Sequence, residues 1–212
     1  MKAFPLTFAI VALTGVGTAQ DLQPLTLPAP RTEGGKPLMQ AIAARHSSRE
    51  FDAKPLPLQE LSDLLWAADG INRRESGKRT APSAMNWQET DIYVLTAVGS
   101  YLYDPSANVL KPVARGDFRS LAGTQDFVAS APVNLVYVVD RARMSRAGDD
   151  DKKIYGGADV GFIAENVYLY CASEGLAVVV RGSVERGKLA AALNLRPEQA
   201  VILAQTVGYP AK

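Results

Sequence analysis

Residues 45–49 read Arg45-His46-Ser47-Ser48-Arg49, and they follow a short helical pattern. Arg45, Ser47 and Arg49 alternate by two, so on an extended segment their side chains point to the same side. Two guanidiniums with a hydroxyl between them offer the charge and the hydrogen-bond donors that a phosphate dianion requires. A solvated basic patch after a helix would have the same pattern, so this stretch alone leaves both interpretations open.

A second stretch, Pro82-Ser83-Ala84-Met85-Asn86-Trp87-Gln88, forms a loop before a run of β-branched and aromatic residues. Its small side chains would let the backbone lie close to a flat ring. Asn86 and Gln88 carry amides that both donate and accept hydrogen bonds, as the polar edge of a heterocycle requires. An ordinary turn before a strand is the alternative.

A third stretch, Leu176-Ala177-Val178-Val179-Val180-Arg181-Gly182, is an apolar run that ends at a glycine. Because Gly182 has no side chain, the end of this strand can lie flat against a ring and direct backbone N–H groups at it. A buried strand followed by its turn gives the same pattern, and by itself this stretch favours that simpler interpretation.

These three segments, taken in order, resemble the flavin-binding pattern of the flavin-dependent nitroreductase family, which includes an azoline-oxidase-like branch. The resemblance covers residues 36–210 and implies FMN as the cofactor. The residues that it assigns to FMN are Arg45, His46, Ser47, Arg49, Pro82, Ser83, Ala84, Asn86, Gln88, Gln125, Val179, Val180, Arg181, Gly182 and Lys212.

The resemblance also implies a role for each group of residues. The stretch at 45–49 and Lys212 would contact the phosphate, and residues 82–88 would lie along the flavin, often from the partner subunit. Gln125 would lie near the pyrimidine ring, and residues 179–182 would face the side of the ring that includes N5. The resemblance assigns no catalytic residue to the protein, because the flavin itself carries the chemistry.

The sequence departs from the family pattern at three places. Arg181 stands where many members have a glutamate, and a cation there would stabilise the anionic reduced flavin. Ala84 replaces a common second serine and removes one hydroxyl. Many members continue beyond the position of Lys212 with an arm that wraps the partner, so the usual extended dimer is in question here.

The activity implied is a two-electron reduction of nitro or quinone-type compounds by a ping-pong scheme, with NAD(P)H or another donor supplying the electrons. A homodimer is expected, because the family binds flavin at the subunit interface. The alternatives are a non-catalytic flavin-binding or electron-carrying module, a flavin-dependent dehydrogenase acting on another substrate, and a flavin-free scaffold. The substrate and the donor cannot be deduced from these residues.

Composition narrows the classes further. The chain has 212 residues, of which 47% are hydrophobic, and 23 basic residues nearly balance 22 acidic ones. This composition suits one globular domain and does not indicate nucleic acid as a partner. The single histidine, His46, excludes zinc sites built from several histidines, and the single Cys171 excludes an intrachain disulfide. We therefore expect no metal.

Two other candidate sites are weaker. A Ser-His-Asp hydrolase would use His46, but the sequence has no Gly-x-Ser-x-Gly elbow. Residues 149–151 are three consecutive aspartates, but they lack the glycine and distal glutamate of a calcium loop and are followed by two lysines. We expect a solvated loop there.

The N-terminus has the pattern of an export signal. Lys2 precedes an apolar run, and the small residues Gly17 and Ala19 favour cleavage after Ala19. The run is too short for a membrane span, and no cysteine follows it for lipid attachment. Residues 1–19 are therefore expected to be a signal peptide of an exported, periplasmic or secreted protein without a stable membrane anchor.

The rest of the chain divides into an arm and one domain. Residues 20–35 are rich in proline and glycine and are expected to form an arm outside the core, and residues 36–212 the FMN-binding domain. The expected fold class is α+β (α/β-like), with a mixed central sheet flanked by helices. Helices are expected at 38–45, 58–69, 117–130, 156–174 and 185–193. Strands are expected at 90–98, 133–139, 176–180 and 200–207, with a hairpin around 104–107 and loops at 71–81 and 140–153.

Overall fold

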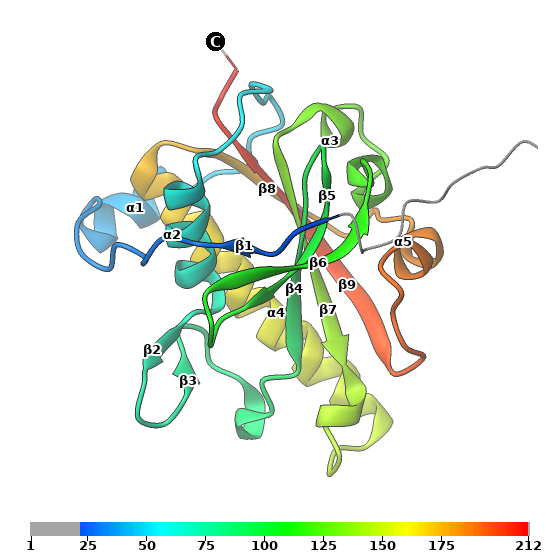
Figure 1. Ribbon diagram of the computed structural model, residues 1–212. Helices are drawn as coiled ribbons and strands as arrows, with labels where there is room; N and C mark the ends of the chain where they lie inside the picture. The colour runs from blue at the N-terminus through cyan, green and yellow to red at the C-terminus, as the bar shows by residue number, and fades with distance from the viewer. Residues whose placement is uncertain (1–21, 212) are drawn as a thin grey trace, which may run out of the picture.

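A seven-stranded sheet forms the centre of the computed structural model, which describes residues 22–211 (Figure 1). The strand order across the sheet is β1-β6-β5-β4-β7-β9-β8. The predicted signal peptide, with its cleavage after Ala19, and the predicted phosphate contact Lys212 lie outside the described residues. The strands are β1 (Leu25–Thr26), β4 (Thr90–Leu95), β5 (Gly99–Asp104), β6 (Val109–Arg115), β7 (Val133–Asp140), β8 (Ala177–Arg181) and β9 (Gln199–Gly208).

Helices cover both faces of this sheet (Figure 1). On one face lie α1 (Leu38–Ala44), α2 (Leu58–Asp69) and the long α4 (Asp149–Glu174). On the other face lie η3 (Arg119–Ala122), α3 (Phe127–Ser130) and α5 (Arg186–Ala192). The short 3-10 helices η2 (Ala84–Asn86) and η4 (Arg141–Arg143) lie in connecting loops.

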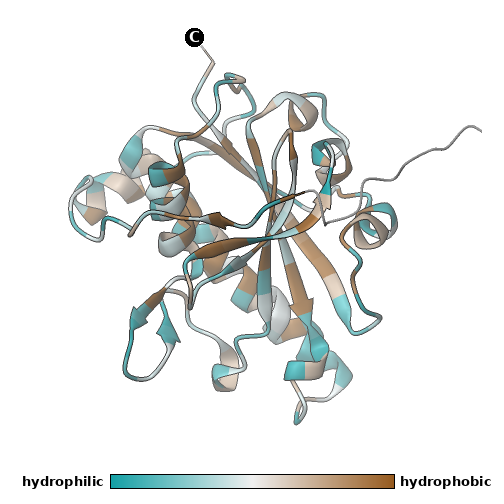
Figure 2. Ribbon diagram, in the orientation of Figure 1, coloured by the Kyte–Doolittle hydropathy of each residue, from teal (hydrophilic) through white to brown (hydrophobic). Residues whose placement is uncertain are grey.

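Strand β7 shows why the sheet is buried on both sides. All eight of its residues are buried. Leu135 and Tyr137 pack into the core under α2 and α4, whereas Val136 and Val138 pack into the core under α5. Successive side chains of a strand point to opposite faces, so an unbroken apolar run serves a sheet covered on both sides. Figure 2 shows the same distribution, with the hydrophobic residues concentrated on the central strands.

The predicted α+β class is confirmed, but the sheet is not mixed. Every strand pair among residues 22–211 is antiparallel. Tight turns connect β4 to β5 and β5 to β6, and such turns can only join antiparallel neighbours. The predicted hairpin around 104–107 is the β5–β6 connection.

Most of the predicted elements are present, and the helix at 58–69 has the predicted bounds. Two of the predicted loops are wrong. Within residues 71–81 the chain forms a small hairpin of β2 (Ile71–Arg73) and β3 (Lys78–Arg79), with Gly77 at a φ of 64° in its turn. Helix α4 begins at Asp149 rather than near 156, because the three aspartates occupy its first turn, where the helix dipole favours negative charge.

The predicted arm is packed onto the body over part of its length. Leu25 and Thr26 pair with β6 at the edge of the sheet, and Leu27 is buried in the core. Arg31 forms an ion pair with Asp63 of α2 at 2.7 Å. The expectation that the arm lies outside the core is therefore wrong for Leu27.

We predict that Leu64→Ala lowers the free energy of unfolding by about 3 kcal/mol, because it leaves a cavity in the core. Leu64 is 0% exposed in α2. Leu58 of the same helix is 45% exposed, so Leu58→Ala is the matched control and should cost less than about 1 kcal/mol. Urea unfolding followed by circular dichroism measures both. Equal losses would contradict this burial pattern.

Candidate functional site

Residues 45–49 run in extended form beside the edge strand β8. Helix α1 ends at Arg45, whose φ and ψ of −60° and 122° turn the chain into an extended path. The Ser48 N–H donates to the Val178 carbonyl at 2.8 Å, which fixes this path against the free edge of β8. At the end of the segment, the Asp52 N–H donates to the Tyr209 carbonyl at 2.9 Å.

Tyr168 of α4 joins this segment to β8. Its Oη lies 2.8 Å from the Ser47 Oγ and accepts a hydrogen bond from the Val180 N–H at 2.9 Å. The guanidinium carbon of Arg45 lies 5.3 Å from the centre of the Tyr168 ring, within the range of a cation–π contact. One phenol thus connects the first and third stretches that the sequence analysis identified.

The two arginines of the segment remain largely uncommitted. The Nε of Arg45 lies 3.9 Å from Glu165, and Arg49 has no hydrogen-bond or ion-pair partner in the part of the chain that the structure describes. The His46 ring has its Nδ1 2.8 Å from the Ala44 carbonyl. A pair of exposed guanidiniums beside a held hydroxyl is a donor set that fits a phosphate.

The end of β8 lies next to the loop that carries Gln125. Val179 is buried, Val180 is half-buried, and Gly182 is exposed. Thr124, next to the exposed Gln125, has its Oγ1 2.9 Å from the Ser183 Oγ. The Val180 N–H is committed to the Tyr168 hydroxyl.

Arg181 has its guanidinium committed to contacts inside the subunit. Its side chain lies on the opposite face of the sheet from Val180, 5.5 Å from the centre of the Phe127 ring. The guanidinium donates to the Ala122 carbonyl and to the Asn134 Oδ1, each at 3.1 Å, and to the Thr206 hydroxyl. Burial lowers its pKa to about 10. These contacts indicate a structural role inside the subunit.

The loop at 82–88 lies at a different place, against the middle of α4. With α2, hairpin β2–β3 and β4 it surrounds a cavity of about 300 Å³. The residues of the loop that line the cavity are Pro82, Ser83, Asn86 and Gln88. The amide of Gln88 donates to the Gly77 carbonyl at 3.1 Å, which ties the loop to the hairpin.

Three residues of this loop have a left-handed backbone. The φ values are 51° at Met85, 55° at Asn86 and 48° at Gln88. This region is unfavourable for residues with a side chain, and such conformations concentrate at functional sites. The predicted ring-facing residue Ala84 is fixed by its N–H, which donates to Asp159 Oδ2 at 2.8 Å.

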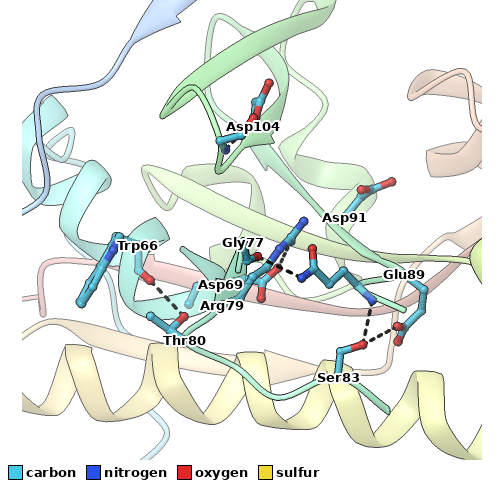
Figure 3. Close-up of polar contacts among 12 residues, drawn as sticks. Trp66, Asp69, Gly77, Arg79, Thr80, Ser83, Glu89, Asp91 and Asp104 are labelled. Carbon is cyan, nitrogen blue, oxygen red and sulfur yellow. Dashed lines mark hydrogen bonds and ion pairs between the residues drawn. The ribbon is translucent and has the colours of Figure 1, made fainter. Parts of the chain in front are cut away.

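Buried acids hold the base of the cavity (Figure 3). Glu89 accepts a hydrogen bond from the Ser83 hydroxyl at 3.1 Å, and burial together with the charge of Asp159 raises the pKa of Glu89. Asp69 pairs with Arg79, yet burial raises the Asp69 pKa to about 7.

The two clusters do not meet within one chain. Asp159, which holds the 82–88 loop, and Tyr168, which holds the 45–49 segment, are separated by about 14 Å along the axis of α4 at the usual rise per residue. None of residues 45–49 or 179–182 lines the cavity behind the loop. Sequence reasoning missed Tyr168, Glu89 and Asp159; the only available signal was polar groups inside apolar patterns.

Comparison with known proteins identifies the family. The nitroreductase family model matches residues 42–209. The chain belongs to the nitroreductase family. A protein of Methanocaldococcus jannaschii, provisionally named a nitroreductase, is 32% identical over 169 residues, which cover 75% of this chain and 85% of the relative. As a member of this family, the chain is a flavin-dependent oxidoreductase.

Solved structures support the same assignment. A provisionally named nitroreductase from Ralstonia eutropha is 42% identical to this nitroreductase-family chain, with a TM-score of 0.86 and full coverage of both chains. The Escherichia coli microcin synthetase complex has a TM-score of 0.69 at 18% identity, covering 100% of this chain and 79% of that one, which shows a shared fold alone.

Two negative findings concern residues 22–211 only. No group of three or more His, Cys, Asp or Glu side chains is placed there to hold a metal ion. In the same range no helix has the length and apolar character needed to cross a membrane.

We predict that Arg181→Ala destabilises this nitroreductase-family protein by about 2–4 kcal/mol, because it removes hydrogen bonds to three buried acceptors and leaves a cavity. Lys188→Ala removes an exposed cation of α5 and should change stability by less than about 0.5 kcal/mol. Denaturant unfolding compares the variants. An unchanged stability for Arg181→Ala would contradict the structural role.

Proposed function

We propose that this protein binds FMN and catalyses a two-electron, NAD(P)H-linked reduction of nitro or quinone-type small molecules. The observation that carries the proposal is the pair of exposed guanidiniums, Arg45 and Arg49, on a segment that Ser47 and Tyr168 hold beside β8. In a chain of the nitroreductase family, this donor set is suited to the FMN phosphate.

The residues of the chain divide the work of holding the cofactor. Arg45, Ser47 and Arg49 would bind the phosphate, and the end of β8 with Gln125 would border the ring. When bound, FMN supplies the capacity to accept and pass on two electrons. The protein then needs to bind and orient the reactants, and no side chain is required to act as an acid or base.

A homodimer is part of the proposal. The amide loop at 82–88 lies too far along α4 to complete the 45–49 cluster of its own chain, so a second chain would supply it. Exposed apolar side chains on α1 and α4 provide a surface for that partner. The members of this apolar face are Leu38, Met39, Ile42, Ile154, Tyr155 and Phe162.

We also propose export to the periplasm or the exterior, on the strength of the N-terminal pattern ending at Ala19. An exported protein meets little free nicotinamide nucleotide. Turnover assays with several electron donors therefore test which donor serves the exported protein. The near balance of charges gives no support for a nucleic-acid partner.

We predict that Arg45→Ala/Arg49→Ala weakens FMN binding by roughly a hundredfold or more, because two charge-assisted contacts are lost. Lys111→Ala/Lys188→Ala removes two exposed positive charges elsewhere and is the matched control. FMN binding is measured by fluorescence titration and by the yellow colour that the protein retains after gel filtration. Equal affinity in the two double variants would refute the phosphate site.

Turnover distinguishes an enzyme of this activity from a flavin carrier. NADH and NADPH oxidation is followed at steady state with a nitroaromatic or a quinone as acceptor. A ping-pong scheme is expected to give parallel lines in double-reciprocal plots of initial rate against the concentration of one substrate at several concentrations of the other. Flavin that is bound but never reduced by either nucleotide would indicate a carrier, or a dehydrogenase with a different donor.

We predict that Phe162→Glu converts the dimer to a monomer, because it places an unpaired charge in the apolar face. Phe162 is 48% exposed in the single chain, and Val98, which is 62% exposed on a turn of the sheet, gives the control Val98→Glu. Light scattering after gel filtration reports the mass. A Phe162→Glu variant that stays dimeric would contradict the proposed interface.

A further inference from the structure

The loop at 82–88 is held by two buried carboxyl groups that come from different elements. Glu89, directly after the loop, accepts from the Ser83 hydroxyl at 3.1 Å. Asp159 of α4 accepts from the Ala84 N–H at 2.8 Å. The Ser83 hydroxyl in turn accepts from the Gln88 N–H at 2.8 Å, so the carboxyls hold both ends of the left-handed stretch.

One oxygen of this arrangement lacks a donor. Glu89 is 0% exposed, and its Oε1 has no hydrogen-bond partner in the described part of the chain. A buried ionised carboxylate with a bare oxygen is costly, and a second carboxylate beside it adds repulsion. A single proton between the two acids removes both costs, since the Glu89 O–H can then donate to Asp159.

We propose that Glu89 and Asp159 share one proton, and that in this state they position the 82–88 loop for flavin binding. They are positioning residues, since each acts through the loop residue that it holds. Loss of the proton leaves two negative charges under a strained loop, so the loop is released. The consequence for flavin rests on the proposed function, but the movement of the loop does not.

Other charged groups around the pair are accounted for. They are Asp69 of α2, Arg73 of β2, Lys78 and Arg79 of β3, Asp91 of β4, Asp140 at the end of β7 and Arg143 of η4. Asp69 pairs with Arg79, while Asp91 and Asp140 both pair with Arg143. Asp69 is a neighbour that also titrates, because burial raises its pKa to about 7. A test must therefore separate it from Glu89.

The sign of the pH effect follows from the direction of the Glu89 shift. The pKa of this carboxyl is raised in the folded protein by burial first and by Asp159 next. Its contribution to holding the loop is complete below the ordinary carboxyl pKa of 4.5 and is lost as the pH rises through the folded value. Flavin binding is thus expected to weaken toward alkaline pH.

Trp87 inside the loop reports this change directly. It is half-buried and lies edge-on to Tyr155, with ring centres 6.0 Å apart. The chain has two tryptophans, so Trp66→Phe leaves Trp87 as the sole tryptophan, whose emission is excited selectively over that of the tyrosines. In this background the purified full-length protein is titrated from pH 5 to 9, with bound flavin measured in parallel by visible absorbance.

Glu89→Gln is the decisive variant, because its amide can donate to Asp159 and accept from Ser83 at every pH. The wild-type sequence should show a pH transition in Trp87 emission and about tenfold weaker FMN binding above it. Glu89→Gln should abolish both, and Asp159→Asn, which also supplies a permanent donor, should do the same. Asp69→Asn should keep the transition.

Two results would overturn the proposal. One is a transition that survives in Glu89→Gln, and the other is the absence of any transition in the wild-type sequence. A Trp87 transition in a protein that binds no flavin would sink the proposed function and leave the proton pair standing. Flavin binding that is independent of pH, in a protein without a Trp87 transition, would overturn the proton pair and leave the proposed function standing.

Discussion

The position of residues 45–49 beside the edge of β8 is the constraint on which the site depends. The Ser48 N–H bonds to the Val178 carbonyl, and the Tyr168 hydroxyl bonds to both Ser47 and the Val180 N–H. These contacts fix which side chains face outward. A shift of one residue along β8 would reverse that parity and turn Ser47 and Arg45 away from Tyr168.

Helix α4 sets the distance between the two halves of the site. Near its middle Asp159 holds the loop at 82–88, and further along Tyr168 holds the segment at 45–49. Because a helix is rigid on this scale, one chain presents both halves but does not join them. Helices α4 and α1 also expose the apolar side chains that we propose as the surface for a second chain. Under the proposed function, this distance along the helix is the reason that a second chain would supply the loop.

Local patterns predicted the parts of the fold that local forces determine. Helix α2 follows from apolar residues at helical spacing between Pro57 and Gly70, and the buried strand β7 from its apolar run. The start of α4 at Asp149 was missed because a charged run can cap a helix or stay in solvent. Strand alternation could have predicted that Arg181 and Val180 point to opposite faces of the sheet. The contact between Tyr168 and Ser47 joins residues 121 positions apart, and no local pattern encodes it.

The central claim is that the flavin site is completed by two copies of this chain, one supplying residues 45–49 and the other the loop at 82–88. Native mass spectrometry of the purified protein tests this claim most directly. The account predicts a dimer that carries one FMN per chain and loses the flavin when it dissociates. A monomer that retains FMN, or a dimer that remains colourless after FMN is added, would contradict it.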